Sequence, residues 1–178
     1  KIGQFPSLIH FENLGIDLSD NDQIYSNIIK AQELINNKSK QLNFFKTHSA
    51  LAKINNKNFT DFNNSLGAIY IVRDPRNVVT SFAHHYQIDI DEATNALINE
   101  KFWNYKNDKV PKTFLSSWST NYNSWKQFND KILFIKYEDL IKNKRRVLIK
   151  VFKFFKNLGV KIDLDIIKLN KIIKTTEF

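Results

Sequence analysis

Hydrophobic and polar positions along the chain follow two spacings, and together they predict strands that alternate with helices. Short apolar runs bounded by turn residues occur at 42–48, 68–72 and 131–137, and their length suits strands. The run at 68–72, AIYIV, is rich in β-branched and aromatic residues, which is typical of a strand buried on both faces of a parallel sheet. Most other segments carry apolar residues three and four positions apart, the spacing of an amphipathic helix.

This helical spacing predicts helices that begin at residue 19 or 20 and near residue 75, and others at 89–101, 113–128, 144–158 and 163–173. Asp74 and Pro75 suit the N-cap and the first position of the second helix, because Pro has no N–H to leave unpaired. The helix at 113–128 carries an aromatic stripe that we interpret as core: Leu115, Trp118, Tyr122, Trp125 and Phe128. Residues 1–18 are interpreted as a loop or short turns.

The order of these elements predicts the fold class. Strands that alternate with helices favour an α/β fold with three layers, in which helices flank a central parallel sheet. The chain has 178 residues, which is the size of one domain with a substantial core. We therefore expect residues 1–178 to form a single domain.

Composition narrows the classes of partner and compartment. The chain has no Cys, which excludes disulfides and thiolate metal sites and fits a reducing compartment, so we expect a cytoplasmic protein. Its formal net charge of +9 favours an anionic partner. No arginine-rich arm or RNA-binding aromatic motif accompanies the lysines, so we favour solvated surface lysines over a nucleic-acid-binding face. A small polyanionic ligand would account for the rest of the charge. No apolar run is long enough to span a membrane, and no signal peptide is visible.

The stretch 67–85, GAIYIVRDPRNVVTSFAHH, holds the strongest candidate for a binding site. A strand that leads into a capped helix leaves backbone N–H groups and the positive end of a helix dipole at the sheet edge, where anions bind. Arg73, Arg76 and Ser81 add side chains that suit phosphate. Alternatively, Arg73 pairs with Asp74 or another carboxylate, and Ser81 is a small helix residue. We favour the phosphate site because all these features occur together.

The sequence RDPRNVVTS, with Arg73 and Ser81 at this spacing and two histidines after it, resembles the 3′-phosphate-binding motif of the sulfotransferases. That family uses 3′-phosphoadenylyl sulfate (PAPS) as the sulfonate donor. The resemblance covers roughly residues 42–178 and implies the sulfotransferase fold, which is similar to that of P-loop nucleotide hydrolases. It also implies that Arg73 and Ser81 bind the 3′-phosphate and that adenosine 3′,5′-bisphosphate is the product.

The resemblance also covers a candidate catalytic segment. Lys46 and His48 lie at the end of the predicted strand at 42–48, on one side of it because strand side chains alternate. A histidine suits removal of a hydroxyl proton near neutral pH, and a lysine stabilises developing negative charge. Spacing alone favours two unrelated basic residues in a loop. KTH, however, resembles the catalytic segment of the sulfotransferases, which implies that His48 is the general base and that Lys46 assists it.

Three further residues are candidate contacts of the adenine ring. Tyr137 ends the predicted strand at 131–137, within the sequence YED, and the family has a tyrosine close to adenine at this point. An equally good alternative is a tyrosine whose hydroxyl bonds to the backbone. Thr176 and Phe178 resemble the segment of the family that lines the adenine pocket.

Two parts of the family pattern are missing from this chain. It has no glycine-containing loop for the 5′-phosphosulfate and no C-terminal Arg-Lys-Gly segment. It also has no Met and begins at Lys1, so we expect a domain that is incomplete at both ends, or a sequence from which residues are missing. The resemblance implies transfer of a sulfonate, without a metal, to a hydroxyl or amine of a small-molecule or carbohydrate acceptor. The identity of the acceptor and the formation of a homodimer stay open.

Two other functions stay open. One is a nucleotide or small-molecule kinase of the P-loop type, which would need magnesium and an acidic residue at a strand end. The predicted strand ends carry Arg73 and Tyr137 instead, which disfavours this function. The other is a basic nucleic-acid-binding domain, which only the net charge suggests, and its affinity would fall steeply with salt.

Overall fold

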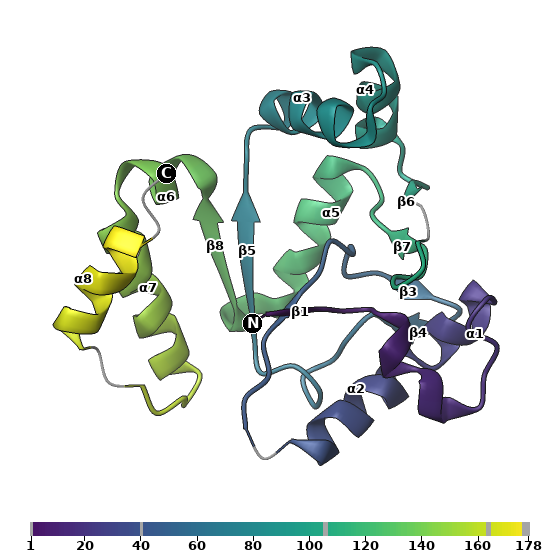
Figure 1. Ribbon diagram of the computed structural model, residues 1–178, viewed down its shortest axis with the longest axis horizontal. Helices are drawn as coiled ribbons and strands as arrows, with labels where there is room; N and C mark the ends of the chain where they lie inside the picture. Colours follow the sequence, from purple (N-terminus) through teal and green to yellow (C-terminus); the bar gives the residue numbers. More distant parts are fainter. Residues whose placement is uncertain (1, 40, 105–106, 163–164, 176–178) are drawn as a thin grey trace. The chain divides into compact units, whose positions relative to one another are not determined.

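The computed structural model describes residues 2–39, 41–104, 107–162 and 165–175 (Figure 1). The chain forms two compact units, and each unit contains two separate stretches of sequence. The first unit comprises Lys1–Ser65 and Val79–Gln127, and the second comprises Leu66–Val78 and Phe128–Phe178. The stretch Val79–Gln127 of the first unit is thus inserted into the sequence of the second.

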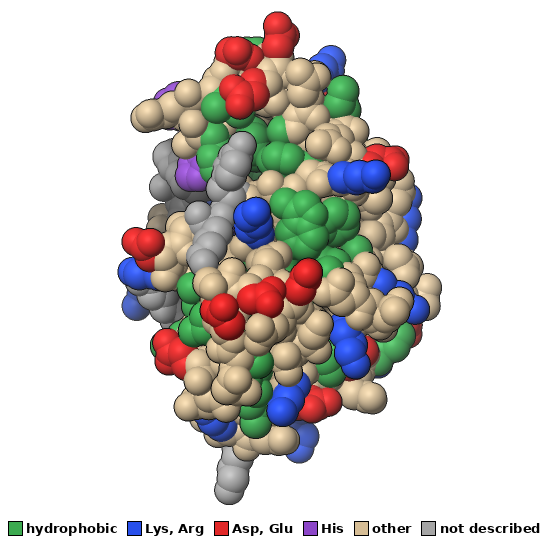
Figure 2. Space-filling view, turned by 90° about the vertical axis from the view of Figure 1, so that its right-hand side faces the viewer, with side chains coloured by type: hydrophobic (Ala, Val, Ile, Leu, Met, Phe, Trp, Pro, Cys, Tyr) green, Lys and Arg blue, Asp and Glu red, His purple; other side chains and the backbone are tan. Residues whose placement is uncertain are grey.

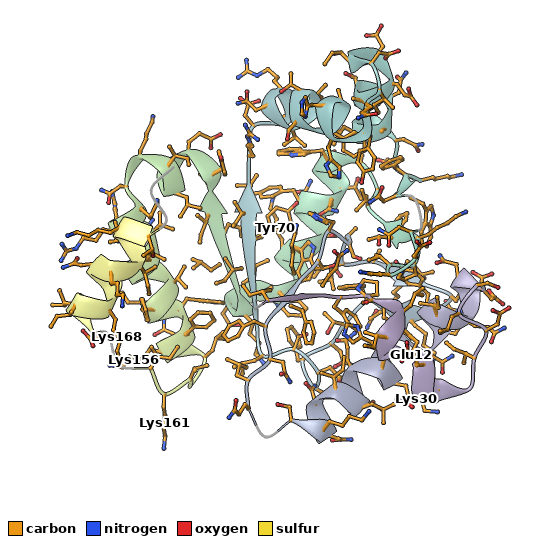
Figure 3. All side chains as sticks on the ribbon, in the orientation of Figure 1. Glu12, Lys30, Tyr70, Lys156, Lys161 and Lys168 are labelled. Carbon is orange, nitrogen blue, oxygen red and sulfur yellow. The ribbon has the colours of Figure 1, made fainter. Side chains whose placement is uncertain are left out.

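Two parallel strands form the centre of the second unit. β5 (Ala68–Val72) pairs with β8 (Ile132–Lys136), and both strands lie where the sequence predicts them. In this register Tyr70 lies beside Phe134, and the centres of their rings are 5.5 Å apart (Figure 3). The parallel pairing confirms the predicted α/β class.

β5 is well covered on one face only. Ile69 and Ile71 are 37% and 53% exposed, whereas Ala68, Tyr70 and Val72 are half-buried. Exposure that alternates along a strand is what one covered face produces, so the predicted burial on both faces was wrong. The apolar run by itself contains no information about what covers the second face.

Helices complete the second unit. The turn after β5 leads into α3 (Pro75–Tyr86), whose first residues belong to this unit. After β8 come α6 (Tyr137–Lys142), α7 (Lys144–Asn157) and α8 (Ile166–Thr175). α7 packs against β8 and against α8, and it buries Val147 and Phe154. Gly159, with a φ of 82°, ends α7 as predicted.

In the first unit, two helices take the place of the predicted helix that begins near residue 20. α1 (Asn21–Ser26) is capped by Asp20, whose carboxylate accepts hydrogen bonds from the next backbone N–H groups. α2 (Ile28–Lys38) follows after Asn27, whose φ of −107° and ψ of 10° separate the two helices. Apolar spacing predicts one buried face for this segment, and on it Ile24, Ile28 and Ala31 are buried and Ile35 is half-buried. Tyr25, which was not predicted, is buried as well.

Pairs of two-residue strands tie the first unit together. β1 (Gly3–Gln4) pairs in parallel with β2 (Phe45–Lys46), so the strand predicted at 42–48 is reduced to two residues. The other two pairs are antiparallel: β3 (Lys53–Ile54) with β4 (Lys57–Asn58), and β6 (Trp103–Asn104) with β7 (Thr113–Phe114). Each of these strands has only two residues and pairs with one other strand. The pairs therefore hold loops in place and do not form a broad sheet.

Residues 2–18 mostly form short turns, as predicted, and include the 3-10 helices η1 (Leu8–His10) and η2 (Glu12–Leu14). Within this segment His10 lies in an aromatic cluster. The centre of its ring lies 5.3 Å from that of Phe5 and 5.5 Å from that of Phe45. Burial in this aromatic cluster lowers the pKa of His10 below its usual value.

α4 (Ile90–Ile98) begins at Asp89 as predicted, but α5 (Trp118–Trp125) is shorter than the helix predicted at 113–128. Ser117 caps α5 by accepting a hydrogen bond from the N–H of Thr120 at 3.2 Å. The residues before it form β7 and a turn, and after it a 3-10 segment, η3 (Lys126–Lys131), completes the helical stretch. The prediction was wrong before Ser117 because a serine side chain favours a helix start, and apolar spacing alone does not detect that signal.

Candidate functional site

The predicted catalytic residues lie at and just beyond the end of β2. Lys46 is the last residue of β2, and its carbonyl oxygen accepts a hydrogen bond from the N–H of Phe5 at 2.9 Å. His48 follows two residues later in an irregular loop, where Thr47 Oγ1 accepts a hydrogen bond from the N–H of Ser49 at 3.1 Å. Lys46 and His48 are both exposed, so a small molecule can reach them.

Helix α5 supplies side chains that bind the main chain of this loop. Asn121 Nδ2 donates a hydrogen bond to the carbonyl oxygen of His48 at 3.1 Å. The indole N–H of Trp125 donates to the carbonyl oxygen of Ser49 at 3.0 Å, and this bond is buried. One face of α5 therefore holds two consecutive peptide groups, at His48 and Ser49.

Two further bonds fix the residues that follow. The N–H of Ala50 donates to the carbonyl oxygen of Phe114 at 2.9 Å, and the N–H of Leu51 donates to Ser124 Oγ at 2.9 Å. Ser49 and Ala50 are only 2% exposed. The loop is thus accessible at His48 and anchored immediately after it.

The electrostatic surroundings of His48 favour its neutral form. Partial desolvation of the ring lowers the pKa of His48 below its usual 6.5, and the positive charges of Lys46 and His85 lower it further. His85 comes from the last turn of α3, and the centre of its ring lies 4.7 Å from that of Tyr86. A neutral imidazole can accept a proton, so a lowered pKa suits a general base that works near neutral pH.

In the second unit, Arg73 and Tyr137 meet at the carboxyl ends of the two paired strands. Arg73 follows Val72, Tyr137 follows Lys136, and Val72 and Lys136 are neighbours in the register. The guanidinium carbon of Arg73 lies 4.7 Å from the centre of the Tyr137 ring, which is the geometry of a cation–π contact. In open α/β sheets, ligands bind at this edge.

The alternative interpretations of these two residues are not supported by the described part of the chain. Asp74, the expected partner of Arg73, binds Arg76 instead: Nε of Arg76 lies 3.0 Å from Asp74 Oδ1, and Nη2 lies 2.6 Å from Oδ2. Among the described residues, no carboxylate lies within ion-pair distance of Arg73. The hydroxyl of Tyr137 likewise has no hydrogen-bond partner there.

The start of α3 differs from the expected anion site. The N–H of Arg76 donates to Asp74 Oδ1 at 2.9 Å, and those of Asn77 and Val78 donate to the carbonyl oxygen of Asp74 at 3.0 and 3.1 Å. The prediction of free N–H groups was therefore wrong, because the residue that caps the helix also satisfies its first donors. Hydrogen bonds from Arg76 also lower the pKa of Asp74 to about 2, so its carboxylate stays charged.

The predicted site residues fall into two groups. Ser81 is exposed in the second turn of α3, in the first unit, which also contains Lys46 and His48. Arg73 and Tyr137 belong to the second unit. The structure places Lys46 near His48 and Arg73 against Tyr137.

Thr176 and Phe178, the other predicted adenine contacts, lie outside the described residues.

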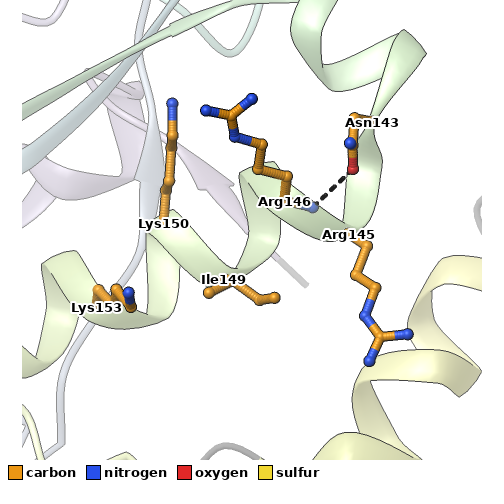
Figure 4. A pocket seen from close by; sticks show the side chains of 6 residues that line it. All are labelled: Asn143, Arg145, Arg146, Ile149, Lys150 and Lys153. Carbon is orange, nitrogen blue, oxygen red and sulfur yellow. Dashed lines mark hydrogen bonds between the residues drawn. The ribbon is translucent and has the colours of Figure 1, made fainter.

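A hollow of about 340 Å³ lies on α7 in the second unit and contains none of these residues (Figure 4). Basic side chains dominate its lining, which comprises Asn143, Arg145, Arg146, Ile149, Lys150 and Lys153. Lys156, Lys161 and Lys168 add basic side chains to the same C-terminal segment (Figure 3). Figure 2 views another face, on which acidic and basic side chains are mixed, as expected for solvated charges.

None of the helices in the described ranges combines the length and the apolar character needed to cross a membrane. In those ranges, no three His, Asp or Glu side chains are grouped so that they could hold a metal ion.

Sequence reasoning missed the side chains of α5 that contact the loop. Trp125 was assigned to the core, and it is indeed 6% exposed. A buried indole, however, usually needs a partner for its N–H, and that requirement is a signal for a polar contact within the core. For Asn121 the sequence contains no comparable signal.

Comparison with known proteins gives consistent matches. The sulfotransferase domain family model matches residues 7–178. The chain is 27% identical over 117 residues to sulfotransferase 1C2 of Rattus norvegicus, and 31% identical over 121 residues to amine sulfotransferase of Oryctolagus cuniculus. Each match covers 65% of this chain but only 37% and 36% of the two relatives, so the chain spans little more than a third of their length.

A solved structure shows the same fold. Mouse sulfotransferase SULT7A1, whose crystal structure is a complex with PAP, superposes with a TM-score of 0.58 at 21% sequence identity. The superposition covers 83% of this chain and 50% of the mouse protein. The likeness at this level of identity concerns the fold.

Proposed function

Because the chain belongs to the sulfotransferase domain family, we propose that the protein transfers a sulfonate group from 3′-phosphoadenylyl sulfate to a hydroxyl or amine of an acceptor. The observation that carries this proposal is the contact between Arg73 and Tyr137 at the carboxyl ends of β5 and β8. A guanidinium suits a phosphate, and an aromatic ring beside it suits a base. An adenine nucleotide with a 3′-phosphate carries both groups.

Arg73 and Ser81 bind the 3′-phosphate in this proposal, and Tyr137 contacts the adenine. The planar fork of Arg73 can donate two parallel hydrogen bonds to phosphate oxygens, whereas the Ser81 hydroxyl can donate one. The charged carboxylate of Asp74 is held by Arg76 and opposes an anion at the helix start. Binding therefore depends on side chains more than on the backbone of α3. Thr176 and Phe178 are assigned to the adenine as well, on the family resemblance.

His48 acts as the general base. As the acceptor oxygen or nitrogen attacks sulfur, a new bond to sulfur forms and the bond from sulfur to the phosphate oxygen of the donor breaks. The proton of the acceptor passes to the imidazole of His48, and the donor leaves as adenosine 3′,5′-bisphosphate. Lys46 stabilises negative charge on the transferring group. No covalent enzyme intermediate is required, because positioning and electrostatics can supply the acceleration.

The exposure of His48 and the relatives support the proposed acceptor class. His48 is exposed, which suits a small-molecule or carbohydrate acceptor that enters from solvent. The match to an amine sulfotransferase supports including amines with hydroxyl compounds. A panel of phenols, alcohols, sugars and amines is therefore the appropriate first screen.

The donor is tested by calorimetry with adenosine 3′,5′-bisphosphate and, separately, with ATP and magnesium. We expect binding of the bisphosphate and much weaker binding of ATP. The opposite preference would favour a P-loop kinase.

The reaction is tested in the full-length protein by transfer of label from PAPS to the acceptor panel, normalised to folded protein. His48→Ala should lower turnover by about 10²–10⁴-fold while donor affinity stays nearly unchanged. His84→Ala removes an exposed histidine of α3 and is the matched control. Near-normal turnover in His48→Ala would end the general-base assignment.

A further inference from the structure

The position of His48 is not set by regular secondary structure. β2 ends at Lys46, and His48 lies in a loop between β2 and β3. Exposed loops are the mobile parts of a fold, yet a general base must be held close to its working geometry. Other parts of the chain must therefore fix the loop.

Helix α5 meets that requirement through polar atoms. Asn121 Nδ2 donates to the carbonyl oxygen of His48 at 3.1 Å and to that of Leu115 at 2.8 Å, so one amide group bridges the loop and the segment before α5. Trp125 lies four residues later, on the same face of the helix, and its indole N–H donates to the carbonyl oxygen of Ser49 at 3.0 Å.

These contacts exceed what packing alone requires. A buried Trp ring could fill its space with its N–H bonded elsewhere, and a half-buried helix position does not require an amide. Here both donors converge on consecutive carbonyl oxygens, those of the proposed base and of its neighbour. Two such bonds restrain the peptide that joins His48 to Ser49, and hence the direction in which the imidazole leaves the main chain.

We propose that Asn121 and Trp125 are positioning residues that hold the main chain at His48 and Ser49, and thereby orient the imidazole toward the acceptor. The inference rests on the proposed role of His48. It assigns a catalytic consequence to two residues that bind main-chain carbonyl oxygens, and it predicts that they act through His48.

Each variant has a matched control on the same helix. Trp125→Phe removes the indole N–H and keeps an aromatic ring, and Trp118→Phe makes the same change where the indole stacks on Tyr122. Asn121→Ala removes the bridging amide, and Asn123→Ala removes an exposed amide whose oxygen accepts a hydrogen bond from Lys126.

We expect Asn121→Ala and Trp125→Phe to lower turnover per folded molecule by about 10- to 10²-fold, the effect of a small misplacement of a catalytic group. The affinity for adenosine 3′,5′-bisphosphate should stay unchanged, and both control variants should turn over normally. Hydrogen exchange of the amides at 48–51 should become faster in the two test variants and not in the controls. If Trp125→Phe does not fold, Asn121→Ala still tests the inference.

A double-mutant cycle separates positioning from general structural damage. In a His48→Ala background, Asn121→Ala should cause no further loss of turnover, because the group that it orients is gone. If Asn121→Ala lowers turnover in the His48→Ala background as much as it does in the wild type, the inference is wrong. It is also wrong if His48→Ala lowers turnover but both test variants turn over normally. Normal turnover of His48→Ala itself would instead refute the proposed general base.

Discussion

The guanidinium of Arg73 lies over the ring of Tyr137, at 4.7 Å from the guanidinium carbon to the ring centre. The N–H donors of a guanidinium lie in the plane of the group and point outward from its edge. The two residues extend neighbouring strands, and among the described residues Arg73 contacts this ring without an ion pair to a carboxylate. A phosphate that meets this edge can be bound by two parallel hydrogen bonds.

This geometry predicts unequal roles for two nearby arginines. Arg73→Ala should weaken binding of adenosine 3′,5′-bisphosphate by about 1.5–3 kcal/mol, since it removes charged hydrogen bonds to the phosphate. Arg76→Ala is the matched control, because the Arg76 side chain is 89% exposed and its donors are bonded to Asp74. Calorimetry that shows equal losses for both variants would contradict the assignment of Arg73.

Tyr137 should act through its ring rather than its hydroxyl. Tyr137→Leu removes both the surface for adenine and the support of Arg73, so affinity for the bisphosphate should fall by about 1–3 kcal/mol. Tyr137→Phe should bind nearly as well as the wild type, because the hydroxyl has no partner among the described residues. A large loss in Tyr137→Phe would show that the hydroxyl binds the nucleotide or the backbone, and would reject the stacking role.

The pKa of His48 predicts the acid side of the pH profile. Desolvation and the charges of Lys46 and His85 lower this pKa below 6.5, so kcat/KM should begin to fall only below pH 6.5. Replacement of Lys46 by Gln or of His85 by Asn removes one of these charges, and the midpoint should rise. An NMR titration of the His48 ring measures the same shift without turnover. A midpoint above 6.5 in the wild type would contradict the prediction.

His10 should make stability depend on pH. Its pKa is lowered by burial, so below pH 6.5 the unfolded chain takes up a proton at His10 that the folded chain resists. The free energy of unfolding should therefore decrease as the pH falls through 6.5, and this contribution is fully present above that value. His10→Phe keeps a ring in the aromatic cluster and should reduce the dependence, whereas His84→Gln, at an exposed histidine, is the control. Denaturant unfolding at pH 5 and pH 7 makes the comparison.

The sequence was most informative where several local signals agreed. At 68–77, an apolar run, an N-cap and a proline all predict a strand followed by a helix, and β5 covers 68–72 while α3 begins at Pro75. Spacing alone could not distinguish Lys46 and His48 from two basic residues of an ordinary loop. Only the family resemblance assigned them a role. The anchoring of this loop by Asn121 and Trp125 depends on packing between distant segments, for which a sequence contains no direct signal.

Errors arose where one signal was trusted alone. Apolar spacing extended the helix at 113–128 across Ser117, although that serine caps α5. An apolar run suggested burial of both faces of β5, although Ile71 is 53% exposed. The prediction of free N–H groups at the start of α3 ignored Asp74. This residue precedes the helix and accepts hydrogen bonds from its first N–H groups. In each case a competing interaction decided the local structure.

The pairing of β5 with β8 also sets the order in which the chain can fold. Residues 73–131 separate the two strands, and Val79–Gln127 of that segment belongs to the first unit. Contacts between such distant segments form slowly, because the loop between them must close first. During synthesis β5 emerges long before β8, and until then the backbone N–H and C=O groups of β5 form an unpaired edge. We therefore expect a ribosome-bound chain that ends before residue 132 to be the form most prone to aggregation.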